Sequence, residues 1–111
     1  MRVIAAVVLL ALAGCRYIPG TEASKIAEGE SQVRDALADP NSAEFRNLSI
    51  REVTGAVCGE VNAKNRMGGF VGFTRFYVLP GFVRFEDGDL GTDTVPVDFD
   101  RLHDDFCGKR H

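Results

Sequence analysis

Residues 62–73 contain the side chains best suited to hold a ligand. The segment combines amide groups, positive charges and aromatic rings, supplied by Asn62, Lys64, Asn65, Arg66, Phe70 and Phe73. Such a polar, cationic rim beside aromatic rings can hold an anionic or glycan ligand, or a partner protein. The alternative is a purely structural turn, because glycine adopts backbone angles closed to other residues and asparagine bonds readily to nearby backbone. Neither G-x-x-x-x-G-K nor G-x-G-x-x-G is present, so we do not expect a phosphate loop.

A second group of residues with chemical potential is acidic. Eight carboxylates lie between residues 86 and 105, with Arg101 as the only Lys or Arg there: Glu86, Asp87, Asp89, Asp93, Asp98, Asp100, Asp104 and Asp105. A small-ligand or calcium-binding role for segment 86–105 is therefore an alternative function. However, an EF-hand loop begun at Asp87 would place Gly91 at a ligand position and Thr92 where glycine is needed. Solvated loop and helix-capping roles explain the same acids, so we expect no metal site and no cofactor.

Charge is distributed unevenly along the chain. Residues 44–84 carry six cations and three anions, opposite in sign to the acidic segment. These two regions are expected either to attract each other in the fold or to steer a partner. The net charge of −3 and the lack of a dense basic stretch argue against nucleic-acid binding, and 45% hydrophobic residues is too many for a disordered chain.

The sequence offers little for catalysis. His103 neighbours Asp104, but no G-x-S-x-G motif supplies a nucleophile. Asp104 and Asp105 are adjacent in sequence and point apart on a helix, which disfavours a glycosidase pair. We therefore expect a protein that is not an enzyme.

The N-terminus is typical of an export signal. Arg2 precedes eleven apolar residues, from Val3 to Ala13, whereas a helix that crosses a bilayer needs about 20. Leu12-Ala13-Gly14-Cys15 resembles the lipobox of bacterial lipoproteins, in which a peptidase cuts before the cysteine and that cysteine becomes lipidated. The resemblance implies a signal peptide over residues 1–14 and a mature chain held in the membrane by several acyl chains, such as palmitate, on Cys15.

The residue after the lipidated cysteine bears on which membrane would hold the protein. It is Arg16, whereas many enteric lipoproteins retained at the inner membrane have Asp there. The implied location is the periplasmic face of the outer membrane of a Gram-negative bacterium. We expect residues 15–20 to form a lipid-anchored tether and residues 21–111 to form a single periplasmic domain, because a chain of 111 residues is too short for more.

Two cysteines remain once Cys15 is assigned to the lipid. Cys58 and Cys107 would then meet in an oxidising compartment, where they are expected to pair. The bond would close a loop of about 49 residues. According to the chain-entropy model, such a bond stabilises the fold by roughly 4 kcal/mol. No C-x-x-C motif is present, which favours a structural disulfide over a redox or metal-binding pair.

Hydrophobic periodicity predicts two helices. Apolar residues spaced three and four apart predict the first over residues 22–38, ended by Pro40 because proline disfavours helix in the residue before it. The second begins near residue 98, and its apolar face carries Phe99, Leu102 and Phe106. Each helix has one apolar face to bury.

Alternating apolar residues and turn signals predict strands between the helices, over residues 48–53, 56–63, 70–79 and 82–85, with a further short edge strand around Pro96. The predicted fold class is α+β, in which an N-terminal helix and a short C-terminal helix pack on an antiparallel sheet of about four strands. The disulfide would join the C-terminal helix to the second of these strands.

Two further motifs resemble a pattern in small, uncharacterised bacterial envelope proteins. The first, D-P-x-S-A-x-F-R, is present as residues 39–46, and the second, C-G-x-V-N-x-K-N-x-x-G-G-F-x-G-F, as residues 58–73. The resemblance implies a fold and an envelope location, and no activity. Together with the lipobox it leads us to expect a non-catalytic binding or structural module that contacts the membrane through Cys15 and an envelope protein or glycan through residues 62–73.

Overall fold

The computed structural model describes residues 20–92 and 98–108. In chain order, this part contains α2 (Glu22–Ala36), the 3-10 turn η1 (Pro40–Ser42), strands β1 (Glu44–Ile50), β2 (Val57–Asn62), β3 (Thr74–Leu79) and β4 (Phe82–Phe85), the 3-10 turn η2 (Gly88–Leu90), and α3 (Phe99–Cys107). The strands form one antiparallel sheet in the order β1-β2-β3-β4. The predicted α+β class is confirmed.

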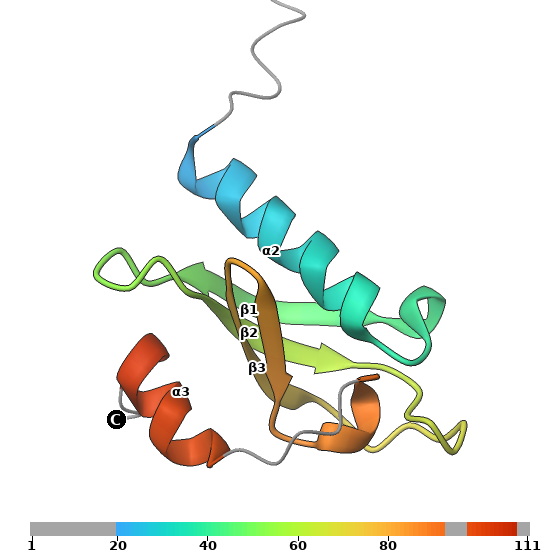
Figure 1. Ribbon diagram of the computed structural model, residues 1–111. Coiled ribbons are helices and arrows are strands. Elements are labelled where there is room, and N and C mark those ends of the chain that lie inside the picture. The colour runs from blue at the N-terminus through green and yellow to red at the C-terminus, as the bar shows by residue number, and fades with distance from the viewer. Residues whose placement is uncertain (1–19, 93–97, 109–111) are drawn as a thin grey trace, which may run out of the picture.

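The domain has three layers, with α2 on one face of the sheet and α3 on the other (Figure 1). Successive side chains of a strand point to opposite faces, so the alternation in β2 and β3 divides their apolar residues between two cores. Val57 and Val61 face α2, whereas Cys58 lies in the core beneath α3. The two helices therefore cover opposite faces of the sheet.

The core on the α2 side is apolar throughout. It is formed by Val33 of α2, by strand side chains, by one residue of η2 and by the residues that directly follow α2 and β2: Val33, Leu37, Val57, Val61, Ala63, Phe76, Val78, Phe85 and Leu90. Helix and sheet approach closely at Gly29, where a Cβ atom would lie 2.8 Å from the Val57 side chain. A glycine that weakens an isolated helix is thus required for packing.

The core on the α3 side is built around Tyr77, whose ring is fully buried between Phe99 and Phe106, with ring centroids 5.4 Å away in both cases. Beside it, the predicted disulfide joins Cys58 of β2 to Cys107 of α3, with Cα atoms 6.0 Å apart. Its position confirms the expected link between the C-terminal helix and the second strand.

The structure corrects the predicted end of the first helix. Thr21 caps its N-terminus by accepting a hydrogen bond from the Ser24 backbone, as expected for threonine there. The helix ends at Ala36, however, and not at residue 38, because Leu37 turns to extended geometry and forms an isolated β-bridge with Gly91. The bridge ties the end of α2 to the segment after η2.

The first strand begins four residues earlier than predicted. A β-bulge interrupts its pairing with β2 between Arg46 and Ser49, and Asn47 there has a φ of 56°. The extra residue allows Phe45 and Leu48, which are three positions apart, to pack on the same core. A strict alternation of two residues could not find this part of the strand.

The third strand is shorter than predicted and begins at Thr74, not at residue 70. Gly72, with a φ of 94°, bends the chain just before it. Phe70 instead forms an isolated bridge with Lys64. The segment between β2 and β3 is therefore a separate loop, which carries most of the predicted binding residues.

Candidate functional site

Residues 63–73, here called the distal loop, connect β2 to β3 at the end of the sheet opposite the 51–56 turn, which connects β1 to β2 (Figure 1). The Lys64–Phe70 bridge closes the loop at its base. The Lys64 backbone also donates a hydrogen bond of 2.9 Å to the Ser42 hydroxyl of η1. The loop is thus closed at its base and attached there to η1.

Asn65 organises the tip of the distal loop. Its side-chain oxygen accepts hydrogen bonds from the backbone amides of Met67, at 3.0 Å, and Gly69, at 3.1 Å. Its own backbone bonds Gly68 and Gly69, and Gly68 has the positive φ of 84° that favours glycine. The structural role considered from the sequence is therefore realised at Asn65, whose side chain faces its own loop.

The two predicted cations of the distal loop are placed differently. Arg66 forms an ion pair with Asp89 of η2, with 2.9 Å between Nη2 and Oδ1, and its backbone amide donates to the Asp89 carbonyl. Lys64 forms no ion pair with any described residue, and its ammonium lies 5.9 Å from the centroid of the Phe70 ring. Arg66 fixes the loop, while Lys64 leaves its charge on the surface.

Two predicted residues lie at the ends of the loop. The Phe73 ring is half-buried under the guanidinium of Arg46, 3.8 Å from its centroid, and Arg46 in turn pairs with Glu60 of β2. Asn62 ends β2, and its buried side-chain oxygen has no hydrogen-bond partner among the described residues. The structure therefore places Lys64 beside Phe70. The other three residues contact different partners: Arg66 contacts Asp89, Phe73 contacts Arg46, and Asn65 bonds to the backbone of its own loop.

The sequence-based prediction included Phe70 but missed Met67 and Val71, which together with Phe70 form the most exposed apolar part of this surface. Met67 is 89% exposed at the loop tip, and Phe70 and Val71 are 55% and 53% exposed. Three apolar residues within five positions, separated by glycines and flanked by cations, were the available signal. An exposed apolar group of this kind on a fixed loop is typical of an interaction site.

The acidic residues serve mainly local roles. Asp87 accepts a hydrogen bond from the Asp89 backbone amide at the start of η2, and Asp98 accepts one from the Arg101 backbone amide at the start of α3. Within residues 20–92 and 98–108, no three side chains of His, Cys, Asp or Glu are grouped to hold a metal ion. Asp93 lies outside the described residues.

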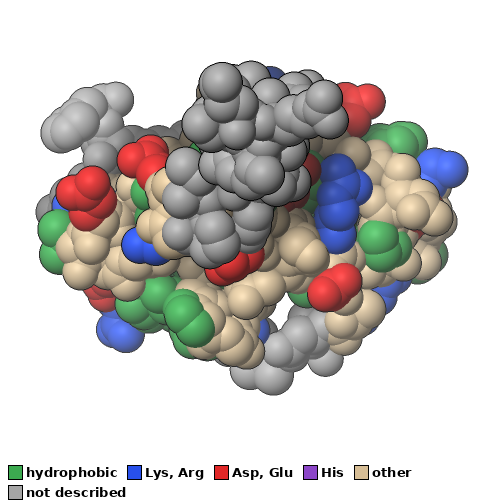
Figure 2. Space-filling model, turned by 90° about the horizontal axis from the view of Figure 1, so that it is seen from above, with side chains coloured by type: hydrophobic (Ala, Val, Ile, Leu, Met, Phe, Trp, Pro, Cys, Tyr) green, Lys and Arg blue, Asp and Glu red, His purple; other side chains and the backbone are tan. Residues whose placement is uncertain are grey.

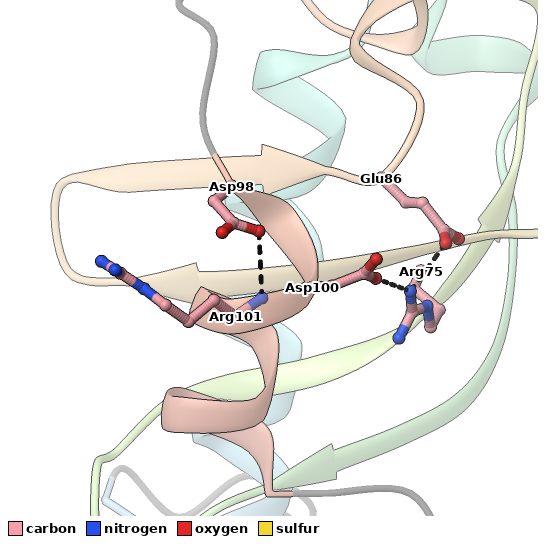
Figure 3. Close-up of polar contacts among 5 residues, drawn as sticks. All are labelled: Arg75, Glu86, Asp98, Asp100 and Arg101. Carbon is pink, nitrogen blue, oxygen red and sulfur yellow. Dashed lines mark hydrogen bonds and ion pairs between the residues drawn. The ribbon is translucent and has the colours of Figure 1, made fainter.

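Arg75 links the acidic segment to the sheet. Its Nη2 lies 2.7 Å from a carboxylate oxygen of Glu86 and 2.6 Å from one of Asp100, whereas the side chain of neighbouring Arg101 points away from this group (Figure 3). The pKa of Arg75 is raised above its ordinary value, and the hydrogen bond to Glu86 is the largest cause. The basic and acidic regions thus attract each other within the fold, one of the two outcomes expected from the sequence.

His103 and Tyr77 lie together inside the α3-side core. The His103 ring, in a residue only 9% exposed, stacks on Phe99 at 5.4 Å between centroids. Burial raises the pKa of Tyr77, while the nearby charge of Arg84 lowers it by a smaller amount. The Tyr77 hydroxyl has no hydrogen-bond partner among the described residues. These groups sit among aromatic rings and not in an open cleft.

The surface on the α2 side shows acidic and basic side chains interspersed, with hydrophobic side chains in small separate groups (Figure 2). The predicted signal peptide, Cys15, most of the predicted tether and the strand expected around Pro96 lie outside the described residues. None of the described helices has the length and apolar character that a membrane crossing requires.

The chain was also compared with known proteins. The comparison finds no match among models of protein families, curated protein sequences or solved structures.

Proposed function

We propose that the protein is a non-catalytic binding module of the bacterial envelope, anchored through lipidated Cys15 at the periplasmic face of the outer membrane, and that the distal loop is its contact surface. The lipobox-like sequence supports the anchor. The exposure of Met67, Phe70 and Val71 on a loop with fixed ends supports the contact surface. This exposure is the observation that carries the proposal.

The distal loop is held in one conformation before a partner binds. Ordering a flexible loop on binding costs free energy, and a loop already held by its own hydrogen bonds avoids most of that cost. Here Asn65 holds the tip, and the Arg66–Asp89 pair holds the loop against η2. Met67 and Phe70 are therefore ready to enter an apolar pocket without a rearrangement of the loop.

The position of the loop suits a protein anchored by its N-terminus. α2 begins beside the 51–56 turn and runs toward the distal loop, so the chain enters the domain at the opposite end of the sheet (Figure 1). A lipid attached before α2 would therefore leave the distal loop free to meet an envelope protein or glycan.

The charge of the loop indicates the chemistry of the partner. Lys64 is a surface cation beside an aromatic ring, and nearby Arg46 has its guanidinium stacked on Phe73. A partner surface with an apolar pocket and a few acidic groups at its rim would match both features.

The test is capture of partners after cross-linking in cells. The double variant Met67→Ser with Phe70→Ser removes the exposed apolar groups, whereas Val53→Ser removes an equally exposed apolar side chain, 87% accessible, at the opposite end of the sheet. We expect the double variant to lose captured envelope components and Val53→Ser to keep them. Equal capture by both variants, at equal abundance of protein, would reject the distal loop as the contact surface.

A further inference from the structure

A groove of about 670 Å³ lies beneath the N-terminal half of α2, at the end of the sheet opposite the distal loop. We call it the proximal groove. Apolar residues of the sheet and its turns form its floor: Ile50, Val57, Val78, Leu79 and Pro80. Its volume is that of a ligand site and not of a packing defect. The groove lies at the end of the domain where the chain enters α2.

The rim of the proximal groove is acidic. Glu22, Glu28 and Glu52 line it together with a single cation, Lys25. None of these four side chains forms an ion pair with another described residue. Their charges are therefore available to an occupant, and they favour one that is apolar and positively charged.

The distal loop has the complementary properties. It projects from the domain, exposes Met67 and Phe70, and carries Lys64 without an ion pair among the described residues. We propose that the proximal groove of one copy of this protein receives the distal loop of a second copy. This inference rests on the proposed function, because it takes the same loop as the contact surface and names the partner as the protein itself.

Geometry excludes contact between the loop and the groove of the same copy. They lie at opposite ends of β2, a strand of six residues that spans about 20 Å. The contact is therefore head to tail, and each pair of copies keeps one free loop and one free groove for further copies. Such heterologous contacts close into rings or continue as open rows.

The anchor is compatible with rows along the membrane. Gly20 lines the groove and is five residues after Cys15, a stretch that spans at most about 18 Å. Each anchored copy would thus keep its groove near the membrane surface. Confinement to one surface also raises the effective concentration of copies, so a contact that is weak in solution becomes significant there.

The experiment is analytical ultracentrifugation of the chain from residue 15 onward, with Cys15→Ser and an oxidised Cys58–Cys107 bond. All buried residues in the described ranges lie between Ser24 and His103, so this chain retains both cores. At concentrations up to about 1 mM we expect a rise in mass that added salt weakens. A loop variant, Met67→Ser with Phe70→Ser, and a groove variant, Glu28→Lys with Glu52→Lys, should each remain monomeric alone.

Mixing the two variants is the decisive step. The loop variant keeps an intact groove and the groove variant an intact loop, so a mixture should form dimers and nothing larger. Asp35→Lys with Asp105→Lys reverses two exposed charges outside the groove and should associate like the unmodified chain. Circular dichroism establishes that each variant is folded.

Two results would overturn the inference: an unmodified chain that stays monomeric throughout, or variants that fail to restore association when mixed. Either would leave the groove to a different occupant. The proposed function fails separately, through unchanged capture of envelope components by the loop variant in cells. A monomeric chain whose loop variant loses capture would reject self-association and keep the loop as a contact surface for another partner.

Discussion

The two faces of the sheet are covered by different means. On the α2 side, a helix of 15 residues buries Val33 in a purely apolar core, together with Leu37, the residue that follows the helix. On the α3 side, a helix of nine residues is held by a disulfide, by the Arg75 ion pairs and by aromatic contacts with Tyr77. A short helix offers less apolar surface for packing, and on this face covalent and ionic links add to it.

The largest expected effect comes from removing the disulfide. Cys58→Ala with Cys107→Ala opens a loop of 49 residues, and the expected loss is about 4 kcal/mol of unfolding free energy. Hydrogen exchange should show α3 losing protection before α2 does, because α2 has no covalent link to the sheet. Equal loss of protection in both helices would remove the contrast between the faces.

The α2 face should be most sensitive to added volume. Gly29→Ala would bring a methyl group to 2.8 Å from Val57, with an expected net loss of about 2 kcal/mol despite the better helix propensity of alanine. Denaturant unfolding measures this loss. Glu28→Ala, an exposed neighbour in the same helix, is the control and should change stability little. A neutral Gly29→Ala would mean that α2 packs less tightly than described.

The ionic link on the α3 face should be smaller and dependent on salt. Arg75→Gln removes both ion pairs of a side chain that is only 14% exposed, at an expected cost of about 1 kcal/mol because both acidic partners face solvent. The difference from the unmodified protein should shrink in 1 M salt, where charges are screened beyond about 3 Å. Arg101→Gln on α3 is the matched control, and an equal loss there would point to a general effect of charge.

The smallest effect concerns Tyr77. Its hydroxyl is buried without a hydrogen-bond partner among the described residues, so Tyr77→Phe should change stability by less than about 1 kcal/mol at neutral pH. Burial raises the Tyr77 pKa above its ordinary value of 10.0, so the folded state favours the neutral phenol. Stability from this group is full below pH 10.0 and is lost as pH rises through the raised pKa. The free energy of unfolding, measured by denaturant unfolding at a series of pH values, should therefore fall more steeply above pH 10.0 for the unmodified protein than for Tyr77→Phe.

Periodicity and cysteine chemistry were sufficient for the α+β class of this fold. The positions of Cys58 and Cys107 predicted that the C-terminal helix is joined to the second strand, whereas the placement of the two helices on opposite faces of the sheet was not predicted. The start of β1 could not be found this way, because the bulge at Asn47 breaks the alternation on which strand prediction depends. A backbone irregularity of one residue shifts every later side chain to the other face.

The sequence predicted where the candidate site lies, but not the role of each residue in it. Glycines and asparagines located the distal loop, and two of its members proved to be structural: Asn65 holds the tip and Arg66 pairs with Asp89. Met67 was missed because exposure depends on tertiary packing, which a single sequence does not record. The same limit hid the proximal groove, whose residues come from α2, from the ends of three strands and from the turns that join those strands at one end of the sheet.

The central claim is that the distal loop touches a partner and that exposed surface outside both the loop and the proximal groove does not. A photo-crosslinking amino acid placed at Phe70 or at Asp105 of the lipidated protein in living cells tests this directly, because both positions are exposed and neither belongs to a core. We predict a discrete crosslinked product from position 70 and none from position 105. No product at position 70, or the same product from both positions, would contradict the account.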